Sequence, residues 1–381
     1  MRLVVLTTGR QDWGLLRPLC SALAADPSFD LRIVAGGMAC SPTFGRVVDT
    51  IREQGLEVAA ELDWKPERHS AVEQSAAALS MVAGALTKLQ PDALVLLGDR
   101  FETAAAALAA TILAVPIVHL FGGEETEGAV DNALRHAITK LSHLHLVAHP
   151  LYAERVIQMG EDPASVHVVG SLATALINRP LPDKPELERA LGVELTEPIG
   201  LVTVHPTTLR EDDQPSEVGA IIGAMEAYPA TWIVTLPNTD PGHELIRAAF
   251  EELAAHVDKV VVTPALGEER YLGLMQLAAF VLGNSSSGLT EAPALRVPTV
   301  NVGDRQKGRI RSASVIDVPP DTHAIVEALQ KAASPEFRRS IATQPLPFGS
   351  GDAARRMVSA LRDWKIPRPP RKAFHSWRPA P

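Results

Sequence analysis

The stretch ALVLLGDRFETAAAALAA, residues 93–110, joins a run of aliphatic residues to a polar turn and an alanine-rich segment. A short apolar run that ends at a glycine is typical of a buried β-strand, and alanine has the highest helix propensity. The stretch therefore predicts a strand followed by a helix, with Asp99 and Arg100 at the turn between them.

The same alternation recurs along the chain in both directions. Further aliphatic or β-branched runs start with MRLVVLTTGR and continue, with helical patterns between them, at residues 32–37, 116–123, 143–149, 166–171, 199–205, 231–238, 259–265, 280–286 and 298–304. Strands that are apolar throughout suit parallel sheets covered by helices on both faces. We therefore predict an α/β protein with doubly wound, Rossmann-like parallel sheets.

The chain has 381 residues, which exceeds the roughly 250–300 residues at which one hydrophobic core stops growing. We expect two domains, an N-terminal one at residues 1–180 and a C-terminal one at 185–355, joined near residues 178–190. Residues 356–381 should contain the end of a final helix and a proline-rich tail.

Charge and composition limit the classes of molecule that the protein is expected to bind. A net charge of -9 argues against a general affinity for nucleic acid or for an anionic membrane, although a local basic patch could still bind a phosphorylated small molecule. Two cysteines are too few for a disulfide framework or a zinc site. The chain opens on a strand pattern without a charged leader or long apolar segment, so we expect a cytoplasmic protein. We also expect a homo-oligomer (dimer or tetramer).

Polar residues gather where the predicted strands end. In open parallel sheets, ligands bind outside the carboxyl ends of the strands. The polar residues at these ends are Thr8, Gly9, Arg10, Asp99, Arg100, His205, Ser285, Ser286, Glu291 and Arg305. Each one has a structural alternative, since an aspartate can cap a helix and a histidine can be a satisfied core residue. Their coincidence at one edge of both sheets favours function.

The motif GNSSSG, residues 283–288, runs directly into a helical pattern. Backbone N–H groups and hydroxyls at such a helix terminus favour a phosphate, which makes Ser285, Ser286, Ser287 and Gly288 candidate ligands. Glu291 could accept hydrogen bonds from ribose hydroxyls. The alternative is an ordinary serine N-cap. The first strand is followed by no Gly-x-Gly-x-x-Gly fingerprint, and the chain has no Walker lysine loop, so the usual signs of NAD(P) and ATP sites are missing.

Residues 120–140, LFGGEETEGAVDNALRHAITK, follow another strand with a glycine pair and a cluster of carboxylates. Glu125 and Glu127 are interpreted as solvated loop charges, because loop carboxylates are mostly exposed. Arg135 and His136 lie on the helix that follows, where they could steady nearby acids.

Five motifs together carry a family resemblance that extends over nearly the whole chain: GDRFETAAAALAA, HLFGGEETEGAVDNALRHAITKLSHLH, HPTT, GNSSSGLTEAPAL and VNVGDRQKGR. They resemble the hydrolysing UDP-N-acetylglucosamine 2-epimerases of sialic-acid-type pathways. The resemblance implies a GT-B-like fold with two domains facing a cleft, a UDP-sugar in that cleft, and a C-terminal helix that crosses back to the N-terminal domain. It also implies conversion of UDP-N-acetylglucosamine to N-acetylmannosamine and UDP through a glycal.

The same resemblance assigns roles to residues. Asp99 and Asp131 match the family's catalytic acids by position, and Glu124 is a third candidate. Removal of a weakly acidic C2 proton requires such positioned groups. The remaining candidates for catalysis and for binding the substrate or its nucleotide are His205, Arg10, Arg100, Arg135, His136, Asn238, Ser285, Ser286, Ser287, Gly288, Glu291 and Arg305. A metal cage is the rival interpretation of the carboxylates, but Arg10, His205 and Arg305 can neutralise a diphosphate, so we expect no metal and no cofactor.

Three departures from the family leave the substrate open. Phe121, Ala39 and Leu15 stand where relatives often carry polar groups, and a lost hydrogen-bond partner can change selectivity by orders of magnitude. Another UDP- or GDP-linked acetamido sugar is therefore possible. Two other classes of function are a GT-B glycosyltransferase and a non-catalytic regulator that binds a sugar nucleotide.

The last residues pose a separate question. Apolar residues at helical spacing in 351–364 predict the crossing helix, with Ala354, Met357, Val358 and Leu361 towards the core. Beyond it, the prolines exclude a helix. The tail is either disordered or anchored through Trp364, Phe374 and Trp377, and the aromatic spacing favours anchoring.

Overall fold

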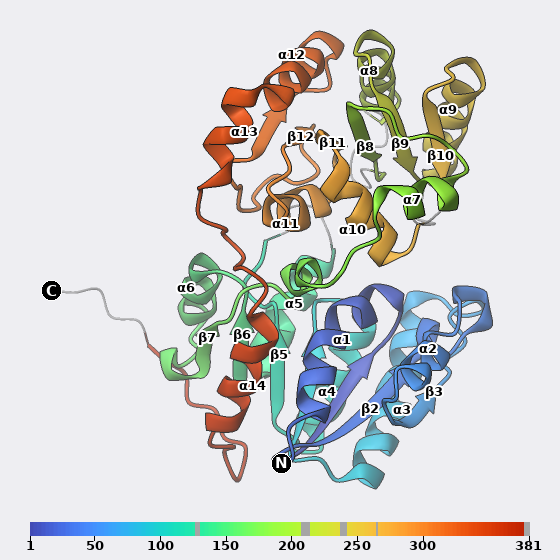
Figure 1. Cartoon of the computed structure of the whole chain (residues 1–381). Helices are drawn as coiled ribbons and strands as arrows, with labels where there is room; N and C mark the ends of the chain where they lie inside the picture. The colour runs from blue at the N-terminus through green and yellow to red at the C-terminus, as the bar shows by residue number, and fades with distance from the viewer. Residues whose placement is uncertain (126–129, 207–213, 237–241, 264–265, 377–381) are drawn as a thin grey trace, which may run out of the picture. The chain divides into compact units, whose positions relative to one another are not determined.

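The computed structural model of the chain describes residues 1–125, 130–206, 214–236, 242–263 and 266–376. It divides into two compact units (Figure 1). Unit 1 contains Met1–Glu125, Val130–Ala175 and Gly351–Pro381, and unit 2 consists mainly of Leu176–Ser350. We expected the C-terminal domain to extend to residue 355, but unit 1 takes the chain back at Gly351, because the helix that begins two residues later packs on unit 1.

Unit 1 is built on a seven-stranded sheet in which every neighbouring pair is parallel. The strand order is β3-β2-β1-β4-β5-β6-β7. The strands are β1 (Arg2–Thr7), β2 (Asp30–Gly36), β3 (Val58–Leu62), β4 (Ala93–Leu97), β5 (Ile117–Leu120), β6 (Leu144–Val147) and β7 (Val166–Val168). The chain winds outward from β1 in one direction and from β4 in the other, so the carboxyl ends of these two strands form the switch point of the sheet.

Helices cover both faces of this sheet. They are α1 (Arg10–Ala24), α2 (Val47–Glu53), α3 (Ala71–Leu89), α4 (Phe101–Ile112), α5 (Val130–Leu141), α6 (Pro150–Gln158) and α14 (Ala353–Asp363). One core cluster joins Val4 and Leu6 of β1 to α3, α4 and α5. Because successive strand side chains point to opposite faces, the equally buried Leu3 and Val5 point to the other face.

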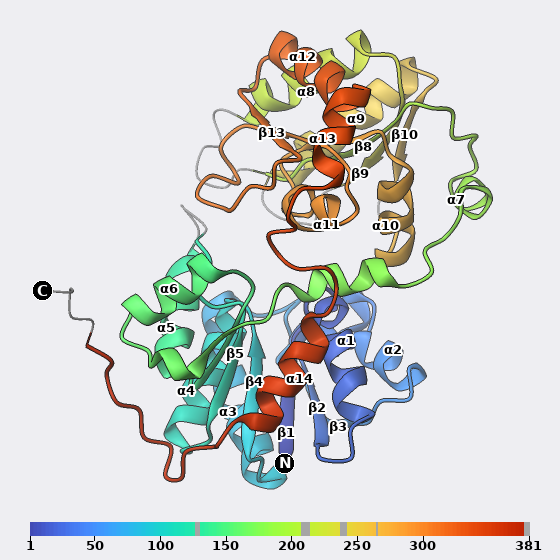
Figure 2. The ribbon, with the colours of Figure 1, turned by 60° about the vertical axis from the view of Figure 1, so that its left-hand side comes forward.

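The final helix α14 packs beside α1 (Figure 2). Met357, Val358 and Leu361 are buried as predicted, but the fourth buried position is Ala353 rather than Ala354. Arg362 forms an ion pair with Asp26, just beyond the end of α1, at 2.5 Å. This confirms the expected final helix on the N-terminal part of the chain.

The tail after α14 is docked on unit 1 as far as the structure describes it. Lys372 lies 2.5 Å from the buried carboxyl group of Glu161, and the N–H of His375 donates to the carbonyl of Gly160 at 2.9 Å. Phe374 remains 70% exposed, so the expected burial of its ring in an apolar groove is wrong; one side of the ring lies against Gly160, and Lys140 Nζ lies 5.1 Å from the ring centroid. Trp377 lies outside the described residues.

Unit 2 repeats the architecture with a six-stranded parallel sheet of order β10-β9-β8-β11-β12-β13. Its strands are β8 (Ile199–Thr203), β9 (Thr231–Thr235), β10 (Val260–Thr263), β11 (Phe280–Gly283), β12 (Thr299–Val302) and β13 (Val315–Val318). Its helices are α7 (Lys184–Leu191), α8 (Gln214–Ala227), α9 (His243–His256), α10 (Glu268–Leu277), α11 (Ser287–Ala294), α12 (Thr322–Ala333) and α13 (Pro335–Ala342). Here the switch point lies between β8 and β11. The two doubly wound α/β sheets confirm the predicted fold class.

Candidate active site

The switch point of unit 1 carries a layer of buried polar side chains. Thr8 follows β1 and donates from its backbone N–H to Asp12 at 3.0 Å, and its hydroxyl also bonds to that carboxyl group. Burial raises the pKa of Asp12, because it outweighs the opposing hydrogen bonds from Thr8 and the charge of Arg100. Arg100 follows β4 and pairs in bidentate fashion with the buried Glu102, at 3.0 and 3.1 Å. Arg10, the first residue of α1, is exposed at the same edge.

Asp99 is held by an arginine from another helix. Arg135 of α5 is almost fully buried and forms an ion pair with the Asp99 carboxyl group. The same guanidinium donates to the backbone carbonyl of Glu124 at 2.8 Å and to Asn132 Oδ1 at 3.1 Å. Arg135 thus connects the turn after β4, the loop after β5 and α5. Removing one partner of a buried ion pair typically costs about 3–5 kcal/mol.

Asp131 lies in the first turn of α5, where the charges of Asp99, Arg100 and Arg135 affect its pKa. Desolvation and the negative charge of Asp99 raise the pKa of the Asp131 carboxyl group. The positive charges of Arg100 and Arg135 oppose this rise without cancelling it. The site thus contains two carboxyl groups in unlike environments, one in an ion pair and one that takes up a proton more easily than usual.

The glycine pair after β5 allows a close backbone approach. Gly123 has φ +81°, and a Cβ atom there would collide with the carbonyl of Tyr152. Just beyond it, Glu125 accepts a hydrogen bond from Asn132 Nδ2 at 2.9 Å and lies 3.1 Å from His136 Nε2. Burial alone would raise the pKa of Glu125, but these partners outweigh it and lower the pKa. The prediction of a solvated Glu125 is therefore wrong: this carboxylate is tied to α5, and His136 contacts it.

A buried histidine supports the turn that carries Asp99. His119 of β5 is fully buried, and burial lowers its pKa to about 3, so the ring is neutral. Its Nε2 lies 2.8 Å from the carbonyl oxygen of Gly98, which can only accept, and therefore carries the proton. Nδ1 then accepts from the hydroxyl of Thr139 at 3.1 Å. His119 fixes the backbone one residue before Asp99.

The switch point of unit 2 brings together His205, after β8, and the serine motif, after β11. The buried side chain of Asn284 hydrogen bonds to both backbone groups of His205, at 2.7 and 2.9 Å. Arg305 donates to the backbone carbonyl of Asn284 at 3.1 Å. Two predicted site residues, His205 and Arg305, are therefore connected through Asn284.

The serine motif opens α11. Ser285 and Ser287 share a hydrogen bond at 3.1 Å, and Ser287 also contacts the hydroxyl of Tyr271 at 2.6 Å. Ser286 is exposed at the N-cap position, where its side chain makes no capping bond. Gly288 is buried, and its carbonyl accepts from Thr299 of β12 at 2.7 Å, which identifies it as a packing position. Glu291 is half-buried in α11, and Asn238 lies outside the described residues.

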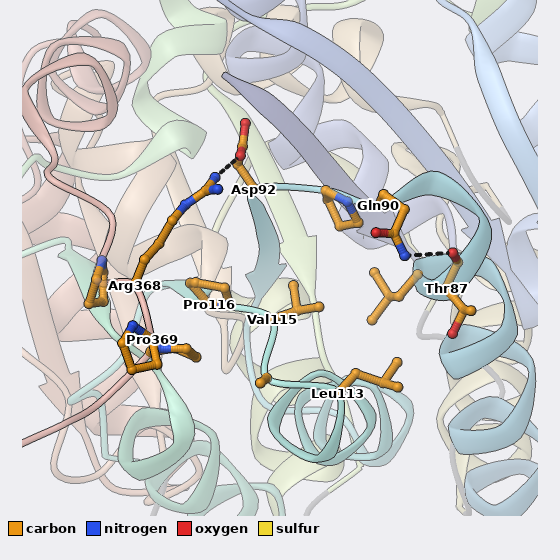
Figure 3. Close-up of a pocket in the computed structure, with 13 residues that line it drawn as sticks. Thr87, Gln90, Asp92, Leu113, Val115, Pro116, Arg368 and Pro369 are labelled. Atoms are coloured by element: carbon orange, nitrogen blue, oxygen red, sulfur yellow. Dashed lines mark hydrogen bonds and ion pairs between the residues drawn. The ribbon is translucent and has the colours of Figure 1, made fainter.

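A cavity of about 430 Å³ in unit 1 does not belong to this site (Figure 3). It is lined by the ends of α3 and α4, the residues before β4 and β5, and residues 367–370 of the tail. Arg368 reaches Asp92 there in an ion pair. Because Asp92 precedes β4 and Asp99 follows it, the cavity and the carboxylates lie at opposite ends of the strand.

Comparison with known proteins identifies the family. A family model described as UDP-N-acetylglucosamine 2-epimerase matches residues 21–362. The chain belongs to the UDP-N-acetylglucosamine 2-epimerase family. This confirms the resemblance seen in the sequence motifs.

Two curated relatives of this 2-epimerase family member cover most of its length. The GDP/UDP-N,N'-diacetylbacillosamine 2-epimerase (hydrolyzing) of Campylobacter jejuni is 34% identical over 345 residues, 89% of each chain. The UDP-N-acetylglucosamine 2-epimerase of Neisseria meningitidis serogroup B is 30% identical over 334 residues, 87% of this chain and 88% of that protein. A crystal structure of UDP-GlcNAc 2-epimerase from Neisseria meningitidis, bound to UDP-GlcNAc, has a TM-score of 0.82 at 19% identity and covers 95% of this chain and 100% of its own. That likeness confirms the GT-B-like fold.

Several buried polar residues of the two units were not predicted: Asp12, Glu102 and His119 in unit 1, and Glu217 and Asn284 in unit 2. Asn284 stands inside the serine motif, and His119 interrupts an apolar strand, so both leave a trace in the sequence. Within the described ranges, no group of three or more His, Cys, Asp or Glu side chains is placed to hold a metal ion. The helices in those ranges are also too short or too polar to cross a membrane.

Proposed function

We propose that this chain is a hydrolysing 2-epimerase that converts UDP-N-acetylglucosamine and water to N-acetylmannosamine and UDP. The observation that carries the proposal is the pair of carboxyl groups of Asp99 and Asp131 in unlike environments. A reaction that removes a proton from one face of a carbon and returns a proton to the other face needs one group that acts as a base and another that acts as an acid. Two neighbouring carboxyl groups, one in an ion pair and one with a raised pKa, can fill these two roles.

The proposed reaction has two steps. In the first, the base takes the proton from C2 while the C1–O bond to the diphosphate breaks, which releases UDP and leaves a C1–C2 double bond. In the second, water adds across that bond: its oxygen joins C1, and a proton reaches C2 from the opposite face. We assign the base to Asp99, which forms an ion pair with Arg135, and the second proton to Asp131, with Glu124 as a further candidate.

The nucleotide is assigned to the switch point of unit 2. The N-terminus of α11 offers Ser285, Ser286 and Ser287, and the positive end of a helix favours phosphate. His205 and Arg305 supply positive or hydrogen-bonding groups for the departing diphosphate. Glu291 is assigned to the ribose hydroxyls.

Isotope labelling tests the function. With UDP-N-acetylglucosamine in deuterated water, N-acetylmannosamine should carry deuterium at C2; in H₂¹⁸O, the released UDP should carry no ¹⁸O, because the C1–O bond breaks. A UDP-linked epimer without free sugar would indicate the non-hydrolysing reaction. Release of UDP only with an added acceptor would indicate a glycosyltransferase, and binding without turnover a regulator.

A second substrate is favoured by one observation. The Campylobacter jejuni relative, at 34% identity, is a 2-epimerase for nucleotide-linked N,N'-diacetylbacillosamine. Comparing kcat/KM for the UDP-linked forms of the two sugars decides between them, and the GDP form tests the nucleotide.

A further inference from the structure

β11 pairs with β8 at the centre of the unit 2 sheet (Figure 1). Asn284 is the first residue after β11. Its side chain is fully buried. A buried amide group is normally hydrogen-bonded through both its oxygen and its nitrogen, so its partners show what it holds in place.

The side chain of Asn284 closes on both backbone groups of one residue. Its Oδ1 accepts the N–H of His205 at 2.7 Å, and its Nδ2 donates to the carbonyl of His205 at 2.9 Å. The same Nδ2 donates to the carboxyl group of the buried Glu217, on α8, at 2.8 Å. The amide therefore fixes the backbone of His205 and is itself oriented by Glu217.

The backbone of Asn284 holds further groups. Its carbonyl accepts from Arg305 Nη1 at 3.1 Å and from Gln306 Nε2 at 2.8 Å, and its N–H donates to Thr203 of β8 at 3.3 Å. The preceding Gly283 has φ +132°, and a Cβ atom there would collide with the backbone of Thr203. The close approach of the two strands that brings these groups together thus requires glycine before Asn284.

We propose that Asn284 is a positioning residue that sets His205 and Arg305 at fixed places beside the serine motif, so that these groups meet one diphosphate. The proposal rests on the nucleotide site assigned above. Asn284 acts through His205 and Arg305, since its own polar side-chain atoms are occupied by His205 and Glu217.

The chemistry explains why the residue is an asparagine. An aspartate has nearly the same shape, but it has no N–H to give to the carbonyl of His205 or to Glu217. Its carboxylate would face the Glu217 carboxyl group at hydrogen-bond distance, where two like charges repel in a site removed from water. Asn284→Asp therefore removes the part of the clamp that needs an N–H donor, with little change in volume.

The test compares three variants of the full chain with the wild type. Asn284→Asp breaks the clamp. The double variant Asn284→Asp/Glu217→Gln exchanges the amide and the carboxyl group, so that a hydrogen bond between the two positions can form again without the second charge. Thr231→Val is the matched control: it removes a buried hydroxyl that bonds to the carbonyl of Thr196 at 2.7 Å, at the opposite end of the unit 2 strands.

Asn284→Asp should weaken UDP binding by about 10-fold or more in calorimetry, in line with the loss of buried hydrogen bonds, and raise KM with a smaller change in kcat. The double variant should recover part of the UDP affinity. Thr231→Val should lower the melting temperature and leave UDP affinity unchanged.

Two results overturn the inference. In the first, Asn284→Asp binds UDP as tightly as the wild type does. In the second, Thr231→Val lowers the melting temperature by the same amount as Asn284→Asp and weakens UDP binding equally. UDP binding and turnover by the wild type show whether a failure concerns this inference or the proposed function. If the wild type binds UDP but does not turn over UDP-N-acetylglucosamine, the proposed reaction fails, while the effect of Asn284→Asp on UDP affinity still decides the positioning role.

Discussion

Replacing Glu161 with glutamine should destabilise unit 1 by about 2–3 kcal/mol at neutral pH. The Glu161 side chain is only 2% exposed, and its carboxylate lies 2.6 Å from Lys140 Nζ and 2.5 Å from Lys372 Nζ. His145 Nε2 lies 3.0 Å away. Glu161 is therefore one of the groups that hold the C-terminal tail to the rest of unit 1.

The magnitude follows from the carboxyl group's pKa. Burial alone would raise the pKa of Glu161, but hydrogen bonds from His145, Lys140 and Lys372 outweigh it and lower the pKa from 4.5 to about 2. At about 1.4 kcal/mol per pH unit, this difference corresponds to about 3 kcal/mol, and the partial exposure of Lys140 reduces it to about 2–3 kcal/mol. Because the folded-state pKa lies below the unfolded value, the stabilisation is complete above pH 4.5 and is lost as the pH falls towards 2.

Scanning calorimetry measures the effect. For a unit of this size, a loss of about 2–3 kcal/mol lowers the melting temperature by about 4–12 °C. The difference between wild type and Glu161→Gln should be largest at pH 7 and should shrink at about pH 3, where the wild-type carboxylate has lost most of its advantage. Glu154→Gln, an exposed change on α6, is the control and should shift stability by no more than about 0.5 kcal/mol. A shift below about 2 °C at pH 7, or one that grows on acidification, refutes the reasoning.

Four further results are expected. Asp99→Asn and Asp131→Asn should each lower turnover by about 100-fold or more while UDP binding survives, and near-normal activity in either variant removes that residue from the mechanism. Arg135→Gln removes a charge that lowers the pKa of Asp131, so the limb of the pH–rate profile that belongs to Asp131 should move to higher pH; a limb that stays in place contradicts the assignment. Activity should persist in EDTA, because arginine and histidine side chains are assigned to the diphosphate, and a loss that Mg²⁺ restores would oppose this. Deleting residues 366–381 should lower the melting temperature of unit 1, since Lys372 leaves Glu161 and Arg368 leaves Asp92; an unchanged value would make the tail passive.

Sequence periodicity predicted every central strand, and it also predicted β7 and β10, which lie at sheet edges. Uniformly apolar runs such as 199–205 and 280–286 became β8 and β11, and the polar residues at their ends became the candidate site. Two strands were not predicted, β3 (Val58–Leu62) and β13 (Val315–Val318). Both lie at the edge of their sheet and are only partly buried, so burial imposes no apolar pattern on them.

The candidate site residues also divide into those that local motifs predict and those whose contacts only the fold decides. Asp99 and Asp131 could be named from motifs, because they follow strand or loop signals in the sequence. The partners that set their charge could not, since Arg135 reaches Asp99 from a helix 36 positions further along the chain. Glu125 illustrates the limit: its loop composition indicates a solvated charge, whereas the fold places Asn132 and His136 against it.

The sequence by itself determined the α/β class, the order of strands and helices and the family, because periodicity and short motifs are local properties of the chain. The tertiary structure alone decided which polar groups face one another: Asn284 with His205, Glu161 with Lys372, and Asp99 with Arg135. These pairs are separated by 36 to more than 200 positions, and their energies arise only when the packing of helices on the sheets removes both partners from water.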